Sequence, residues 1–169
     1  MSGGIRPAEP PDAAAIRAVH LAAFPTATEA DLVAALDRDG DTVVSLVGET
    51  QGEIVGHALL SRMRVTGGGR DRRAVALAPV GVRPDFQGAG VGRRLIEGAL
   101  AIARATGEEL VFVLGEPAYY GRFGFSAEAA APFASPYAGP YFMALALKEG
   151  PALHEKGEAA YAPAFAGLA

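Results

Sequence analysis

The chain has 169 residues and a formal net charge of −4 at pH 7; 50% of its residues are hydrophobic and 20% are charged. This length and balance are typical of one globular domain with its own core, and they exclude a disordered chain. The acidic balance argues against a nucleic-acid partner, because such proteins usually carry a basic domain. The chain contains no cysteine, which excludes a disulfide framework, a cysteine nucleophile and a cysteine-ligated metal centre.

The sequence shows none of the segments that direct a protein into or across a membrane. Residues 1–12 contain three prolines and no apolar stretch of the kind found in signal peptides. No run approaches the roughly 18 apolar residues that a membrane helix needs. We therefore expect a cytoplasmic protein with no membrane partner and no metal, either a monomer or a homodimer.

Apolar residues recur at helical spacing or in extended runs along the first half of the chain. They predict an edge strand at 5–8, helices at 13–23 and 28–38, and strands at 42–47, 53–65 and 73–82. Pro7 fits an edge strand because it has no N–H to donate to a neighbouring strand. Asp12 is placed to cap the first helix, and Ile16 and Val19 predict the buried face of that helix.

The second half of the chain predicts a strand–helix–strand unit followed by shorter elements. These are a helix at 91–105, a strand at 110–114, a short helix at 116–122 and a last strand at 141–147. A crossover helix implies parallel strands and hairpins imply antiparallel ones, so we expect a mixed sheet of six to seven strands flanked by helices. This is an α/β (α+β) class domain at 1–148, with an extension at 149–169. The extension is too polar and glycine-broken for much structure, but Tyr161 and Phe165 are expected to dock on the domain.

A glycine-rich loop, from Gln87 to Gly92, joins a predicted strand to a predicted helix. Glycine lets the backbone approach a ligand closely, and the free N–H groups of a helix N-terminus attract anions, so phosphate is the expected ligand. A P-loop would need Lys and then Ser or Thr after the last glycine, where Arg93 and Arg94 stand. A dinucleotide fingerprint would need glycine at position 93 or 95. The pattern that fits at every fixed position is Gln/Arg-x-x-Gly-x-Gly/Ala.

That pattern resembles the pyrophosphate loop of the GNAT superfamily of acetyl-CoA-dependent N-acyltransferases. The resemblance extends from Ile5 to about Leu147 and includes Val80-Gly81-Val82-Arg83-Pro84 before the loop. The segment from Leu114 to Phe125 and the tail from Gly157 to Phe165 are similar to a bacterial branch often labelled YhbS-like. The resemblance implies a GNAT fold whose sheet is splayed between its fourth and fifth strands.

The resemblance also implies acetyl-CoA as co-substrate, with its pyrophosphate on the loop and its pantetheine arm on the fourth strand. Main-chain groups of Val80 and Val82 would bind the arm, and the Val80 N–H would stabilise the oxyanion. Pro79 fits this scheme because it removes a donor and disturbs the pairing of the strand. The residues assigned to acetyl-CoA are Val80, Val82, Gln87, Gly88, Ala89, Gly90, Val91, Gly92 and Arg93.

By the same resemblance, Tyr120 occupies the position of the general acid. A phenol with a reference pKa near 10 suits protonation of a leaving thiolate. The general base is less defined, because the strand at 73–82 has no acidic residue. Glu116, one helical turn before Tyr120, is the candidate, although an acid at a helix N-terminus is also favourable for the helix dipole alone. His57, a water chain or the backbone are the alternatives.

The expected function is transfer of an acetyl group from acetyl-CoA to a primary amine by direct attack. The alternative is a non-catalytic domain that binds acetyl-CoA as a sensor or interaction module. The acceptor would be shaped by the loop at 24–28, the hairpin at 65–72 and the proline-spaced segment at 131–140, because loops carry specificity. A small amine, an amino acid and a peptide or protein amine all remain open.

Overall fold

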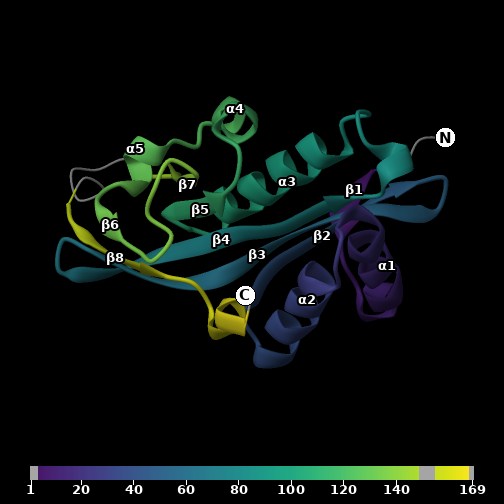
Figure 1. Cartoon of the computed structure of the whole chain (residues 1–169), viewed down its shortest axis with the longest axis horizontal. Helices are drawn as coiled ribbons and strands as arrows, with labels where there is room; N and C mark the ends of the chain where they lie inside the picture. The colour runs from purple at the N-terminus through teal and green to yellow at the C-terminus, as the bar shows by residue number, and fades with distance from the viewer. Residues whose placement is uncertain (1–3, 149–154, 168–169) are drawn as a thin grey trace.

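The computed structural model describes residues 4–148 and 155–167, and its architecture is a mixed sheet with helices on both faces (Figure 1). The strands are β1 (Ile5–Pro7), β2 (Thr42–Thr50), β3 (Glu53–Gly67), β4 (Arg70–Val82), β5 (Leu110–Leu114), β6 (Phe133–Ala134), β7 (Phe142–Ala146) and β8 (Gly157–Ala160). The α-helices are α1 (Ala13–Ala23), α2 (Thr28–Asp39), α3 (Val91–Ala105), α4 (Pro117–Tyr120) and α5 (Ala127–Ala130). Short 3-10 turns lie at Pro10–Asp12, Pro84–Phe86, Gly121–Phe123 and Pro163–Gly167.

The strands are ordered β1-β2-β3-β4-β5-β7, with β8 beside β3 and β6 beside β8. Pairs β4–β5 and β6–β8 are parallel, and the other pairs are antiparallel. The expected mixed sheet of the α/β class is therefore confirmed. The sheet has eight strands rather than six or seven, because β6 and β8 are too short to leave a pattern in the sequence.

Helix α3 covers β2 and β3 and makes the crossover between β4 and β5 (Figure 1). Its buried residues recur at helical spacing, as an amphipathic helix requires. Glycine lets the helix come close to the sheet: a Cβ at Gly56 would lie 2.8 Å from Val91 Cγ1 and 2.9 Å from Leu95 Cδ1. This contact positions the first turn of α3 beside the end of β4.

The parallel pairing of β4 with β5 stops well before β4 ends. It runs from Ala74 opposite Leu110 to Ala76 opposite Phe112, whereas β4 continues to Val82. Residues 77–82, the open segment of β4, therefore lack a β5 partner. This is the splay between the fourth and fifth strands that the resemblance implied.

The open segment also carries a bulge on the side that faces β3. Ala58 lies opposite Val80, but Leu60 lies opposite Leu77, so Ala78–Pro79 form an irregularity in the ladder. The Ala78–Pro79 peptide bond is cis. Because proline has no N–H, it cannot donate to the ladder, and bulges accommodate it.

Within the described part of the C-terminal extension, residues 155–167, the expectation of little structure is wrong, because a strand and a 3-10 turn form there. Strand β8 pairs with β3 from Gly157 opposite Gly67 to Ala160 opposite Arg64. The edge that β8 uses belongs to a distant part of the chain, which local composition cannot reveal. Phe165 is buried in one cluster with Leu32 and Leu36 of α2, and the Tyr161 ring lies beside it with centroids 4.8 Å apart.

The expected capping role of Asp12 is wrong. Its side chain makes no capping hydrogen bond to α1. The carboxylate instead accepts from the Glu9 N–H at 2.7 Å and from Arg6 Nη1 at 2.8 Å. Asp12 therefore fastens the turn before α1 to β1.

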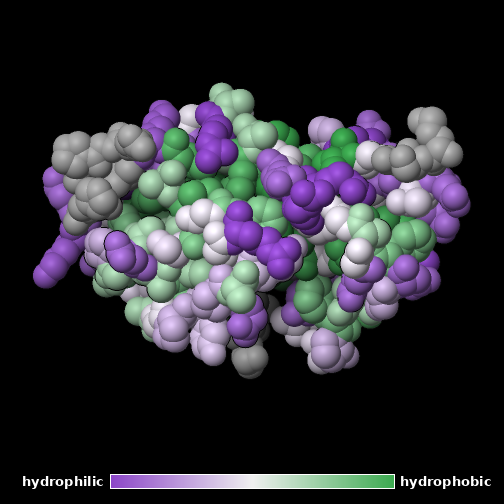
Figure 2. Space-filling model, turned by 90° about the horizontal axis from the view of Figure 1, so that it is seen from above, coloured by the Kyte–Doolittle hydropathy of each residue, from purple (hydrophilic) through white to green (hydrophobic). Residues whose placement is uncertain are grey.

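The outer surface carries both apolar and hydrophilic residues. Seen from the side that carries α3 and α4, apolar and hydrophilic residues are interspersed across the face (Figure 2). Across residues 4–148 and 155–167, no helix has the length and apolar character needed to cross a membrane.

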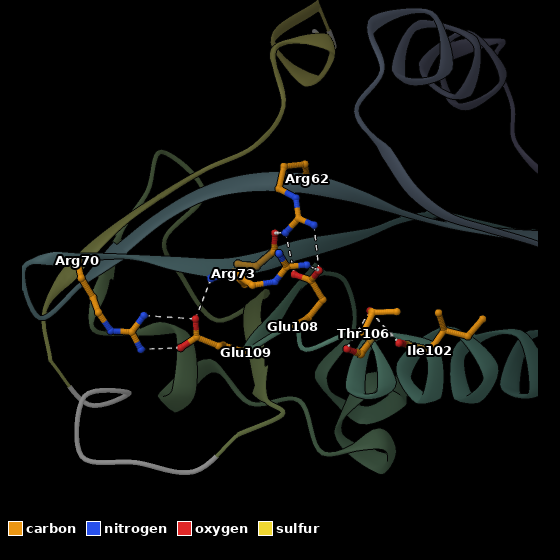
Figure 3. A network of polar contacts seen from close by, with 9 residues as sticks. Arg62, Arg70, Arg73, Ile102, Thr106, Glu108 and Glu109 are labelled. Carbon is orange, nitrogen blue, oxygen red and sulfur yellow. Dashed lines mark hydrogen bonds and ion pairs between the residues drawn. The ribbon is translucent and has the colours of Figure 1, made fainter.

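An ionic network holds β3, β4 and β5 together at their paired end (Figure 3). Arg62 donates to both oxygens of Glu108, at 2.7 and 2.9 Å, and Arg73 donates to the same carboxylate at 2.7 Å. Burial alone would raise the pKa of the Glu108 carboxyl, but the hydrogen bonds from the two arginines outweigh burial and lower it. Next to this group, Arg70 Nη2 donates to Glu109 at 2.8 Å.

Replacing Glu108 by Ala should destabilise the protein because two arginines lose their shared partner. A broken buried ion pair costs about 3–5 kcal/mol, and the arginine side chains here are 36% and 57% exposed and can reach water, so we expect a loss of about 2–3 kcal/mol. Urea unfolding measures the change. Asp85→Ala, which removes an exposed pair at 3.9 Å, is the control and should change stability by less than about 0.5 kcal/mol. An equal loss of unfolding free energy in both variants would contradict the stabilising role of the Glu108 ion pairs.

On the face of the sheet opposite to α3, two buried histidines join α1 to β3. His20 Nε2 and His57 Nδ1 lie 2.8 Å apart, and His57 Nε2 lies 2.8 Å from Ser45 Oγ. Burial lowers the pKa of His20 to about 4. Burial, with a smaller contribution from His20, lowers the pKa of His57 to about 3. Both rings are therefore neutral at neutral pH and serve packing and hydrogen bonding.

This pair predicts a loss of stability in mild acid. Since histidine in an unfolded chain has a pKa near 6.5, the unfolded state binds protons below that pH while the native state does not. Unfolding free energy should therefore fall as pH drops from 6.5 to 4.5, by up to about 1.4 kcal/mol per pH unit for each histidine. Urea unfolding at several pH values gives the unfolding free energy at each pH. For His57→Gln this free energy should change less steeply with pH than for the wild type. An unchanged slope would contradict the prediction.

Candidate active site

Two cavities lie along the open segment of β4. The first, the Tyr120 cavity, has a volume of about 330 Å³ and is lined by Phe24, Thr28, Glu29, Leu32, Leu77, Ala78, Pro79, Val80, Leu114, Tyr120, Tyr137, Tyr161 and Phe165. The second, the loop cavity, has a volume of about 390 Å³ and is lined by Val82, Phe86, Gln87, Gly88, Gly90, Val91, Gly92, Arg93, Tyr119 and Arg122. Val80 and Val82, two residues apart on β4, thus line different cavities.

The loop cavity is built by the glycine-rich segment and the first turn of α3. Gly88 and Gly90 have φ of 80° and 85°, a left-handed backbone that favours glycine. Gly90 immediately precedes α3, so the next N–H groups have no intrahelical partner and carry the positive end of the helix dipole. Gln87 Nε2 donates to the Val82 carbonyl at 3.0 Å and holds the loop against β4. The arrangement can bind a phosphate anion.

Most residues that the sequence assigned to acetyl-CoA lie together at these cavities. Six of the seven loop residues line the loop cavity, as does Val82, and Val80 lines the Tyr120 cavity. Ala89 lines neither cavity; its carbonyl accepts from Arg94 Nη1 at 3.4 Å.

Arg122 is a cation at the loop cavity that the sequence reasoning missed. Its guanidinium lies 5.0 Å from the ring centroid of Tyr119, and both side chains line the cavity. The signal for this contact was present in the sequence, because residues three apart share a face of a helical turn. With Arg93, it gives the cavity two positive charges.

The Tyr120 ring packs against the backbone of Gly115, the residue that follows β5. A Cβ at Gly115 would lie 2.8 Å from Tyr120 Cδ2, so glycine is needed for the ring to pack there. The rings of Tyr119 and Phe125 flank it, with centroids 5.0 and 6.0 Å away. Burial, with a smaller effect of Tyr119, raises the pKa of Tyr120 to about 12. The phenol is therefore protonated at neutral pH.

Glu116 does not share a cavity with Tyr120. Its side chain is exposed and lines neither cavity, while its carbonyl accepts from the Tyr120 N–H at 3.0 Å. It precedes α4 and has the geometry of an acid at the start of a helical turn. His57 is likewise absent from both linings, since it is buried on the α1 side of the sheet.

Two polar groups that the sequence reasoning did not assign lie at the Tyr120 cavity. Glu29, in the first turn of α2, and Tyr161, just after β8, both line it. Glu29 Oε1 and the Tyr161 hydroxyl are buried, and neither has a hydrogen-bond partner among the described residues. Glu29 stands in no motif. Tyr161 belongs to the tail that resembles the YhbS-like branch, but only tertiary packing shows that its hydroxyl reaches this cavity.

No metal centre is formed by the described residues: no group of three or more His, Cys, Asp or Glu side chains among them is placed to hold an ion. The two cavities present a glycine-rich loop at a helix N-terminus, an open strand edge, a protonated phenol and a carboxylate.

Comparison with known proteins agrees with this geometry. The model of the family described as "Acetyltransferase (GNAT) domain" matches residues 4–127. YjhQ of Escherichia coli K12, an uncharacterized N-acetyltransferase, is 42% identical over 116 residues, which cover 68% of this chain and 64% of YjhQ. The match thus spans less than two thirds of that relative.

Solved structures resemble the whole fold. The N-acetyltransferase YhbS of Escherichia coli, solved in complex with CoA, has a TM-score of 0.88 and 30% identity, over 100% of this chain and 94% of that one. A GNAT acetyltransferase of Brucella melitensis, solved with acetyl-CoA, has a TM-score of 0.78 and 34% identity, over 96% and 97% of the two chains. From the family match and these likenesses, the chain belongs to the GNAT acetyltransferase family.

Proposed function

We propose that this protein transfers the acetyl group of acetyl-CoA to a primary amine by direct attack, with Tyr120 as the general acid. The observation that carries the proposal is that Tyr120 lines a cavity together with Pro79 and Val80 of the open segment of β4. Val82, two residues further along the same strand, lines the loop cavity.

The residues present fit acetyl-CoA along its length. The N–H groups of Val91, Gly92 and Arg93 and the cation of Arg122 suit a pyrophosphate. The open segment of β4 leaves main-chain groups without a β5 partner, and these suit the two amides of a pantetheine arm. When bound, acetyl-CoA supplies an activated acyl thioester.

In this scheme the residues of the chain orient the reactants and move one proton. The Val80 N–H donates to the carbonyl oxygen on which negative charge develops, as oxyanion-binding donors do. Tyr120 Oη holds its proton at neutral pH, because its pKa is raised to about 12 by burial and by Tyr119. It gives that proton to the departing sulfur, so the thiol rather than the thiolate leaves. The attacking amine is neutral and loses one N–H proton to solvent as the amide forms, and the Tyr120 phenolate regains a proton from solvent, so the protons balance.

Replacing Tyr120 by Phe tests the general acid. The ring and its packing remain, but the proton is lost, so we expect kcat to fall by a factor of about 10² to 10⁴ while the affinity for acetyl-CoA is retained. Thiol release over a library of primary amines measures turnover, and calorimetry measures the affinity. Tyr141→Phe, which alters an exposed phenol outside both cavities, is the matched control. Turnover of Tyr120→Phe equal to that of the control would refute the role.

Arg122→Gln tests the phosphate end of the site. Loss of one partly solvated cation should weaken coenzyme A about tenfold, whereas pantetheine, which lacks the pyrophosphate, should bind unchanged. Calorimetric titration of both ligands separates the two effects. Arg104→Gln, at the exposed far end of α3, should leave both affinities unchanged. Equal weakening of both ligands by Arg122→Gln would show that the arginine acts on the fold rather than on the phosphates.

A further inference from the structure

We propose that the Tyr120 cavity accepts a small primary amine with a single positive charge on an apolar body, and that Glu29 binds its ammonium group. The bound ammonium group gives up one proton to solvent before the neutral amine attacks the thioester. The inference rests on the proposed function, since it names the acceptor class of the same site. Four features carry it: an unpartnered carboxylate oxygen, an unpartnered hydroxyl, apolar walls and a small volume.

The first feature is the state of the Glu29 carboxylate. Glu29 lines the cavity from the first turn of α2, and its Oε1 is buried without a hydrogen-bond partner. A buried polar atom left in this state is costly, and more so when it carries charge. The buried Glu108 makes the contrast, because two arginines satisfy it. Glu29 therefore lacks a donor that a ligand would supply, and an ammonium group brings three.

The second feature is the Tyr161 hydroxyl, which reaches the cavity from the other end of the sequence. It too is buried without a partner among the described residues. Burial, with a smaller effect of Tyr137, raises the pKa of the Tyr161 phenol, so it stays neutral. A neutral hydroxyl can accept a hydrogen bond from the same ammonium group or exchange one with a polar atom of the acceptor. The Glu29 carboxylate and the Tyr161 hydroxyl can thus both accept hydrogen bonds from a ligand with an ammonium group.

The walls define what the ammonium group is attached to. Phe24, Leu32, Tyr137 and Phe165 present apolar and aromatic surface around the two polar groups. Apolar walls favour an apolar body, and aromatic faces also attract a cation. The volume of about 330 Å³ is at the lower end for ligand pockets, and an acetyl group must share it. The acceptor is therefore small.

The charges of the lining exclude other amines as good acceptors. Among the described residues that line the Tyr120 cavity, Glu29 is the one charged side chain. A polyamine would bring a second ammonium group that finds no second carboxylate there. An amino acid would bring a carboxylate that finds no cation and loses its hydration. One charge on an apolar body fits best.

Steady-state kinetics with three probe amines tests the proposal. Phenethylamine carries one charge on an apolar body, phenylalanine adds a carboxylate, and spermidine adds further ammonium groups. We expect phenethylamine to have the highest kcat/KM. Glu29→Gln should raise its KM about 10- to 100-fold, the loss of one charge-assisted hydrogen bond, and should affect kcat less than KM. Glu29→Asp, which keeps the charge, should recover part of the loss.

The matched control is Asp31→Asn. Asp31 lies in the same first turn of α2, but its side chain is 66% exposed and pairs with Arg17 rather than lining the cavity. Both substitutions remove one negative charge from the helix N-terminus, so an effect of the dipole alone would appear in both. An unchanged KM in Asp31→Asn alongside a raised KM in Glu29→Gln assigns the effect to the cavity.

Failure of this inference differs from failure of the proposed function. If the enzyme acetylates amines but Glu29→Gln keeps the wild-type KM, or if spermidine or phenylalanine is preferred, the acceptor class is wrong while the function stands. If no amine releases thiol, the proposed function fails. Calorimetric titration of phenethylamine into protein saturated with coenzyme A then tests the site directly. Binding that Glu29→Gln abolishes supports the inference, and absence of binding to the wild type overturns it.

Discussion

The rest of the site depends on the early end of the pairing between β4 and β5. Backbone groups that lose a strand partner must find another in the protein, in water or in a ligand. Beyond Ala76 the open segment of β4 is in that position, and Pro79 interrupts its ladder on the other side. At the opposite end of the same strands, Glu108 binds arginines from β3 and β4. The strands are thus fastened at one end and apart at the other.

Two cavities, the Tyr120 cavity and the loop cavity, lie along the open segment of β4, and local backbone geometry determines which side chains line each one. Val80 and Val82 are two residues apart, so they share a face of β4 and lie roughly 7 Å from each other along it. Tyr119 and Tyr120 are consecutive on a helical turn, so their side chains point about 100° apart and reach different cavities. One strand and one turn therefore set both the phosphate end and the reactive end of the site.

How far the sequence predicted this molecule depended on the range of each interaction. The loop from Gln87 to Gly92 was predictable because its function follows from neighbouring residues: glycines, then a helix start. Tyr120 was placed by resemblance to a family motif. The sequence did not predict Glu29 as a residue of the cavity, because an acid in the first turn of a helix already suits the helix dipole. Only packing against aromatic rings from distant parts of the chain buries its oxygen. The exposure of Glu116 is likewise a tertiary property, which its place one helical turn before Tyr120 could not reveal.

The pairing of β8 with β3 has a consequence for the order of events during synthesis. Residues Arg64–Gly67 of β3 are made about ninety residues before the strand that covers their free edge. Until β8 has left the ribosome, that edge presents unpaired N–H and C=O groups, a template for pairing with another chain. The nascent chain is therefore open to misassembly during the whole interval between the emergence of β3 and that of β8, and a chaperone that covers this edge would act in that interval.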